Sequence, residues 1–143
     1  LRGYTLETDM RWNKTVGNSY GLIFDIRGDF ESYYVFDLNA ETQKWQFYRY
    51  TPTGVIKYVS PTVSTAIKSG TAVNHLKVIR NSGWIWLYIN DTRMPGCPYP
   101  DMSPNLQPSD VGVGAGGYPL ISNADARFDN FRVSPPEKSM PLP

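Results

Sequence analysis

Large aromatic side chains recur at every second position of one short segment near the middle of the chain. The row consists of Trp84, Trp86 and Tyr88, and it alternates with Ile85, Leu87 and Ile89. Alternate residues of a β-strand point to the same face, and the aliphatic set suits a core better. The rings are therefore expected to face outward as an aromatic patch that can stack on the C–H face of a sugar. The alternative is that the row packs beneath the proline-rich loop that follows it, or beneath a flanking strand.

Polar side chains that suit sugar hydroxyl groups occur on two earlier, consecutive segments. Asp25 and Arg27 share a strand face with Ile23, and Tyr33 and Asp37 share one with Val35. Neighbouring strands would then present carboxylate, guanidinium and phenol groups together. Arg49, with Trp45 and Phe47, would extend this arrangement. The expected ligand-binding residues are Asp25, Arg27, Tyr33, Asp37, Arg49, Trp84, Trp86 and Tyr88.

The elements that hold these residues are predicted to be strands, because alternation with period two dominates the chain. It appears over residues 4–12, 20–26, 33–38, 45–50, 55–59, 76–78, 84–89, 111–117 and 126–133. Turn signals such as Asn81-Ser82-Gly83 separate these segments. Prolines are dense between Asp91 and Asp110, which predicts a long surface loop without ladder hydrogen bonds. The pattern is typical of an all-β chain that forms an antiparallel two-sheet sandwich.

Length and charge limit the function classes. The 143 residues suffice for one domain, and we expect a β-sandwich module over 1–134 with a proline-rich linker or tail over 135–143. Fourteen basic and 13 acidic residues leave a net charge of +1, which gives no field for nucleic-acid binding. No apolar run approaches the roughly 20 residues of a membrane span, so no membrane insertion is expected. Cys97 is the single cysteine and His75 the single histidine, and neither has partners at the spacing of a catalytic triad.

Several of these segments together resemble a known superfamily. They are Tyr20-Gly21-Leu22-Ile23-Phe24, Leu76-Lys77-Val78, Trp86-Leu87-Tyr88-Ile89-Asn90 and Phe128-Asp129-Asn130-Phe131-Arg132-Val133. From Tyr4 to Val133 the chain resembles the concanavalin A-like lectin/glucanase superfamily, and more narrowly the laminin-G-like jelly-roll modules of extracytoplasmic bacterial proteins. The resemblance implies two curved antiparallel sheets packed face to face, with a concave face that often holds carbohydrate. The loop over 92–110 departs from the pattern of these modules, which usually turn tightly there.

Glycosidases of the superfamily that the chain resembles place two carboxylates on one strand face, because a proton donor and a nucleophile must flank one glycosidic bond. Glu7 and Asp9 are at alternate positions, but no further carboxylate follows at Arg11, Trp12 or Asn13. We interpret the pattern as catalytically incomplete, and Glu7 and Asp9 as solvent-facing residues opposite Leu6 and Met10. A hydrolase would need carboxylates from separate strands, such as Asp25 and Asp37.

The same sandwiches commonly hold a structural calcium ion, which takes carboxylate and carbonyl oxygens at strand ends. Asp129 is the candidate ligand here, helped by Asp125 or Glu7. The alternative is that Asp129 caps a turn by accepting hydrogen bonds from backbone N–H groups. Apart from this ion, no cofactor is expected.

The sequence therefore predicts a non-catalytic carbohydrate-recognition module of a larger extracellular or cell-surface protein. Its expected partner is a glycan or cell-wall polysaccharide on the concave sheet, with flanking domains in the same chain. The alternative is a protein-interaction or adhesion spacer, in which the aromatic row packs against a partner domain. A glycoside hydrolase is the third hypothesis.

Overall fold

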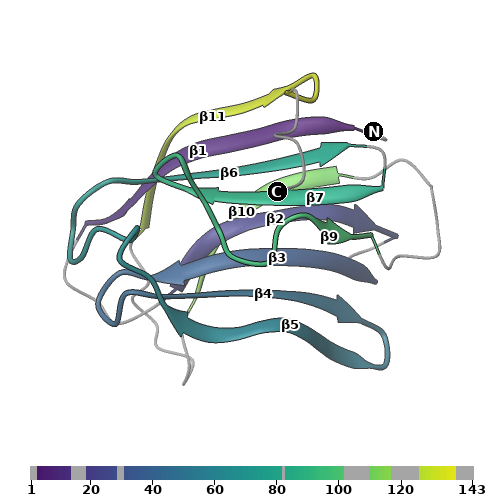
Figure 1. Cartoon of the computed structure of the whole chain (residues 1–143), viewed down its shortest axis with the longest axis horizontal. Helices are drawn as coiled ribbons and strands as arrows, with labels where there is room; N and C mark the ends of the chain where they lie inside the picture. Colours follow the sequence, from purple (N-terminus) through teal and green to yellow (C-terminus); the bar gives the residue numbers. More distant parts are fainter. Residues whose placement is uncertain are drawn as a thin grey trace.

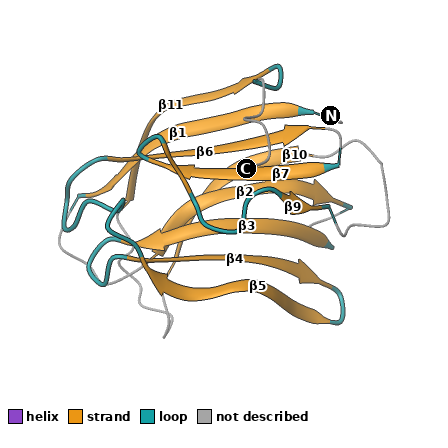
Figure 2. Cartoon of the chain, in the orientation of Figure 1, coloured by secondary structure: helices purple, strands orange, loops and turns teal. Residues whose placement is uncertain are grey.

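A computed structural model describes residues 3–13, 19–28, 31–81, 83–101, 110–116 and 126–137. These residues form strands connected by turns and loops (Figure 2), and no described helix could cross a membrane. The strands are β1 (Tyr4–Trp12), β2 (Ser19–Arg27), β3 (Ser32–Asn39), β4 (Lys44–Thr51), β5 (Gly54–Val63), β6 (Asn74–Asn81), β7 (Trp84–Ile89), β8 (Thr92–Arg93), β9 (Tyr99–Pro100), β10 (Asp110–Gly116) and β11 (Ala126–Ser134).

The strands make two antiparallel sheets, and Figure 1 shows both running along the long axis of the molecule. The six-stranded sheet has the order β11-β1-β6-β7-β8, and β9 also pairs with β7. The five-stranded sheet has the order β10-β2-β3-β4-β5, so the consecutive strands β2 to β5 are all neighbours. The predicted all-β, two-sheet sandwich of the jelly-roll type is confirmed.

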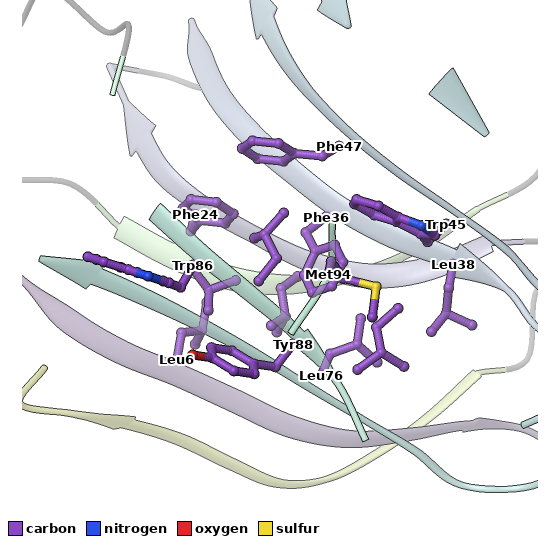
Figure 3. Close-up of a cluster of buried hydrophobic side chains, with 14 of the residues drawn as sticks. Leu6, Phe24, Phe36, Leu38, Trp45, Phe47, Leu76, Trp86, Tyr88 and Met94 are labelled. Carbon is purple, nitrogen blue, oxygen red and sulfur yellow. The ribbon is translucent and has the colours of Figure 1, made fainter. Parts of the chain in front are cut away.

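The core lies between the two sheets and follows the alternation in the sequence. Figure 3 shows rings from the five-stranded sheet next to aliphatic side chains from the six-stranded sheet. The residues without solvent exposure include Leu22, Phe24, Phe36 and Phe47 from the former and Leu6, Leu76, Val78 and Leu87 from the latter. Burial of each such side chain contributes about 1.5–3 kcal/mol, so this interior is the main source of stability.

A β-bulge in β2 turns Asp25 into this interior. The register with β3 shifts between Phe24 and Arg27, and Asp25 has a φ of 49° in the left-handed region. An inserted residue changes which face a side chain takes. Asp25 is only 3% exposed, whereas alternation predicted it on the outward face with Arg27. That prediction is wrong, because period-two reasoning assumes an unbroken strand.

Buried charges join the sheets around Asp25. The carboxylate accepts hydrogen bonds from the Tyr4 hydroxyl and, at 2.9 Å, from Arg80 Nε. Arg80 also donates to Asp101, which accepts a bond of 2.7 Å from the Tyr34 hydroxyl. Tyr4 and Arg80 belong to the six-stranded sheet, while Asp25 and Tyr34 belong to the five-stranded one. The network therefore fixes how the two sheets face each other.

The described part of the proline-rich loop pairs with the six-stranded sheet. β8 and β9 both pair with β7, and Pro100 lies opposite Trp84 in register. The prediction of a loop without ladder pairing is therefore wrong for residues 92–93 and 99–100, while 102–109 lie outside the described residues. Cys97 is buried here against the backbone of Leu87, and burial raises the pKa of its thiol to about 11. The thiol stays protonated at neutral pH and is unreactive.

The first residues after β11 return to the outer face of the six-stranded sheet. The Glu137 N–H donates to Thr5 Oγ1 at 2.9 Å, and the Glu137 carboxylate lies 3.1 Å from Lys77 Nζ. Residues 138–143 lie outside the described residues. The division into a module over 1–134 and a tail over 135–143 stays a prediction.

Removing the cation of the buried network is expected to destabilise the fold. Arg80→Met leaves the buried carboxylates of Asp25 and Asp101 without their guanidinium partner, which should lower the free energy of unfolding by about 3–5 kcal/mol. Lys77→Met is the matched control on the same strand, because it breaks a partly exposed pair with Glu137 and should cost about 1 kcal/mol or less. Urea denaturation measures both. Equal losses for the two variants would contradict the assigned role of Arg80.

Candidate functional site

The outer face of the five-stranded sheet gathers aromatic and polar side chains from β3 and β4. Residues directly opposite each other in a ladder share a face. Three outward pairs follow one another along the two strands: Tyr33 with Tyr50, Val35 with Tyr48, and Asp37 with Gln46. On β5, Lys57 lies opposite Tyr48. We call Tyr33, Asp37, Gln46, Tyr48, Tyr50 and Lys57 the β3–β4 face.

An aromatic stack forms one end of the β3–β4 face. The rings of Tyr33 and Tyr50 have centroids 5.1 Å apart and planes inclined by 17°. The Tyr50 ring is solvent-exposed, at 39%. Burial, followed by the nearby Asp37 and Tyr33, raises the pKa of Tyr48 to about 12, so its hydroxyl stays protonated. This end therefore offers ring surface and a permanent hydroxyl donor.

A carboxyl group with an unusual pKa forms the other end of the face. Asp37 is 8% exposed, and Gln46 Nε2 donates to its Oδ2 at 3.2 Å. Burial raises the pKa of Asp37 to about 6, although the Gln46 hydrogen bond and the Lys57 charge both act to lower it. A carboxylate held in low dielectric makes strong hydrogen bonds to hydroxyl groups.

Gly21 on β2 makes room for this carboxyl group. It lies opposite Asp37 in the ladder, and a Cβ placed on Gly21 would come within 2.6 Å of the Asp37 Cβ and 2.1 Å of the Phe36 carbonyl oxygen. No side chain fits there without moving β3. The glycine therefore lets Asp37 lie close against the backbone of β2.

The structure divides the polar residues that the sequence analysis grouped together. Tyr33 and Asp37 lie on the β3–β4 face, as the shared strand face predicted. Asp25 lies on the inner side of the same sheet with Arg80, and Arg27 Nη2 is 3.9 Å from its carboxylate. Arg49 pairs with the buried Tyr34 and so shares its inward face. These three residues do not extend the outward face.

The aromatic row of β7 does not form the expected exposed patch. Its residues lie opposite Asn81, Ile79 and Lys77 of β6, away from the inter-sheet core. Trp84 is 41% exposed, but Trp86 is 5% and Tyr88 8% exposed, and both belong to the buried cluster in Figure 3. Lys77, which is paired with Glu137, lies 4.9 Å from the centre of the Tyr88 ring. The prediction of three solvent-exposed rings is wrong for these two, because both are buried.

The carboxylates at Glu7 and Asp9 hold a histidine. His75 Nδ1 lies 2.7 Å from Asp9 Oδ1, and its Nε2 lies 3.0 Å from Glu7 Oε1. Arg132 also contacts Glu7 Oε1, at 3.0 Å. Glu7 is buried, so the expectation that it faces solvent is wrong. Asp25 and Asp37, the example pair of the hydrolase hypothesis, lie on opposite sides of their sheet and so cannot flank one glycosidic bond.

The described residues do not suit the calcium ion that the resemblance implies. Glu7 is occupied by His75 and Arg132, and Asp129 Oδ1 accepts the N–H of Asn130 at 2.8 Å. Asp125 lies outside the described residues. Within the described ranges no three His, Cys, Asp or Glu side chains form a group that could hold a metal ion. The Asn130 contact is the backbone bond that the turn-capping alternative requires.

Sequence reasoning missed Gln46, Tyr48, Tyr50 and Lys57. Their signal was present, because Gln46, Tyr48 and Tyr50 alternate with the apolar Trp45 and Phe47. The same alternation that identifies Trp45 and Phe47 as core residues places Gln46, Tyr48 and Tyr50 on the opposite, outward face. The pairing of β3 with β4, which no local sequence pattern shows, places Tyr50 next to Tyr33 and Gln46 next to Asp37.

Comparison with known proteins supports the fold. No protein-family model matches the sequence, and no curated protein is similar enough in sequence to count as a relative. Among solved structures, the carbohydrate-binding module CBM66 from Bacillus subtilis matches at a TM-score of 0.65 and 17% identity, over 94% of this chain and 76% of that one. Sheep galectin-11 matches at 0.65 and 13% identity, over 93% and 90% of the two chains.

An enzyme also contains this fold as one part. The GH43 protein BlXynB from Bacillus licheniformis matches at a TM-score of 0.65 and 13% identity, over 94% of this chain but only 28% of the enzyme. At such identities the likeness concerns the fold alone. The narrower resemblance to laminin-G-like modules stays a prediction. The chain thus has the concanavalin A-like jelly-roll fold.

Proposed function

We propose that this chain is a non-catalytic carbohydrate-binding module that binds glycan on the β3–β4 face. The observation that carries the proposal is that one sheet face holds the stacked pair Tyr33–Tyr50 at one end and the buried Asp37–Gln46 pair at the other. Carbohydrates present apolar C–H faces and hydroxyl edges together, so a site needs both ring surface and fixed polar groups. We further propose that the chain acts in an extracellular or cell-surface protein with flanking domains, where polysaccharide is its partner.

Each residue has a distinct part in this proposal. The exposed Tyr50 ring, held in place by Tyr33, supports one face of a sugar ring. Asp37 accepts hydrogen bonds from sugar hydroxyl groups, and Gln46 fixes the direction of its carboxylate. The Tyr48 hydroxyl donates, and Lys57 adds a donor from β5. These roles are stacking and hydrogen bonding alone, and none of them breaks a covalent bond of the glycan.

The proposal is supported by its agreement with the fold neighbours. CBM66 is described as a carbohydrate-binding module, and galectin-11 was solved with glycerol, a small polyol. Fold alone does not determine function, so the assignment depends on the residues of this face. The spacer alternative relied on the β7 aromatic row, of which only Trp84 is exposed in this chain.

Removing a ring from the stack is expected to weaken glycan binding at least tenfold. Tyr50→Ala deletes the exposed ring and Tyr33→Ala its support, and tenfold corresponds to about 1.4 kcal/mol. The glycan is first found by array screening of the wild-type chain, and affinities are then measured by calorimetry. Trp84→Ala is the control, since it removes an exposed ring from the other sheet. Loss of binding in Trp84→Ala with retention in Tyr50→Ala would contradict the proposal, as would the absence of any glycan ligand.

Asp37→Asn should separate stability from binding. The folded pKa is raised from 3.8 to about 6, so the native state binds this proton more tightly than the unfolded state. Protonated Asp37 therefore contributes to stability fully below about pH 4. This contribution is lost as the pH rises through about 6, and the free energy of unfolding falls by about 3 kcal/mol in total. The variant should unfold at higher urea concentration than wild type at about pH 8 and similarly at about pH 3.

The same variant should bind glycan more weakly at about pH 8, although it is more stable there, because the charged acceptor is gone. Glu41→Gln, which changes an exposed carboxylate in the turn after β3, should alter neither property. If Asp37→Asn were less stable than wild type at about pH 8, the assigned burial of this charge would be incorrect. If it bound glycan normally, Asp37 would not be part of the site.

A further inference from the structure

A groove lies at the end of the six-stranded sheet, on the other sheet from the β3–β4 face. Its volume is about 360 Å³, and β1, β11 and the residue before β6 line it. The lining residues are Asp9, Met10, Arg11, Val73, Arg127, Phe128 and Asp129. Nothing in the proposed function uses this groove. We call it the β1–β11 groove.

Like charges oppose each other across this groove. Arg11 lies directly opposite Arg127 in the ladder, and Asp9 lies directly opposite Asp129. Opposed residues on one face have Cβ atoms about 4.5–5.5 Å apart, and like charges in this position are destabilising. Two rows away, Glu7 instead faces Arg132, which is the favourable arrangement. Arg11 and Arg127 are thus ladder neighbours that line the same groove, an arrangement that costs the fold stability.

The carboxylates of the groove are directed to other partners. Asp9 Oδ1 contacts His75 Nδ1 at 2.7 Å, and Asp9 Oδ2 accepts from Asn130 Nδ2 at 2.8 Å. The Asn130 hydrogen bond lowers the pKa of Asp9, and His75 adds to this effect. Asp129 Oδ1 accepts the Asn130 N–H. Arg127 takes part in at least one other interaction. Both arginines nevertheless line the groove as ladder partners.

From this placement we infer that the β1–β11 groove binds an oxyanion, a carboxylate or sulfate group, between Arg11 and Arg127. A planar guanidinium can donate two parallel hydrogen bonds to such a group, and two guanidinium groups can hold it from both sides. Val73 and Phe128 give the groove an apolar wall next to the charges. An acidic sugar suits both parts, whereas a free inorganic oxyanion uses only the charged part.

Amide chemical shifts of the whole chain test the inference. Sodium glucuronate and sodium sulfate are the probes, with sodium chloride at equal ionic strength and glucose as blanks. The amides of residues 9–11, 73 and 127–129 should shift with the probes and not with the blanks. A higher affinity for glucuronate than for sulfate would identify an acidic sugar as the ligand. An equal or lower affinity for glucuronate would identify a free oxyanion, and either result supports the oxyanion site.

Matched variants make the test specific. Arg11→Gln and Arg127→Gln should each weaken binding tenfold or more, and Arg11→Lys should weaken it less, because it keeps the charge but not the paired donors. Arg132→Gln removes an exposed arginine from the same strand, β11, and should leave binding unchanged. Dispersed amide spectra check that each variant folds.

Two results would overturn the inference: no shift with either probe, or equal losses in Arg11→Gln and Arg132→Gln. Tyr50→Ala should leave oxyanion binding in this groove intact. A failure of this inference can therefore be distinguished from a failure of the proposed function. Binding that responds to Tyr50→Ala but not to Arg127→Gln would assign the probes to the β3–β4 face and likewise overturn the inference.

Discussion

A single register between β3 and β4 determines both the core and the candidate site. In this ladder Phe36 faces Phe47 on the inner side, and Asp37 faces Gln46 on the outer side. The side-chain period of a strand is two, so a slip by one residue would exchange the two faces completely. The apolar inner face therefore specifies the register, and the register assembles the stack and the carboxyl pair outside. Stability and the proposed glycan recognition therefore have the same cause.

The second constraint is the buried charge network that joins the sheets. Asp25, Arg80 and Asp101 are held in the interior by one another and by the hydroxyls of Tyr4 and Tyr34. Such a network stabilises little by comparison with apolar packing, but it tolerates few alternative arrangements of its partners. The network therefore fixes the relative position of the two sheets.

Period-two alternation was enough to predict most of the fold. It identified the inward residues of β3 and β7 and the common outward face of Tyr33 and Asp37, because unbroken strands obey it. It failed at Asp25, where a bulge with a positive φ breaks the period. It also failed at Trp86 and Tyr88, which are buried although they alternate with the core residues Ile85, Leu87 and Ile89. The partners of Asp37 on β4 needed the strand order, which no local pattern contains.

We propose that glycan binds to the outer face of the five-stranded sheet. A crystal structure of the chain with the oligosaccharide that binds best in an array screen tests it most directly. We expect a sugar ring against Tyr50 and, further along the same oligosaccharide, a hydroxyl group within hydrogen-bonding distance of the Asp37 carboxylate. A sugar bound instead beside Trp84 on the six-stranded sheet, with the β3–β4 face empty, would contradict it.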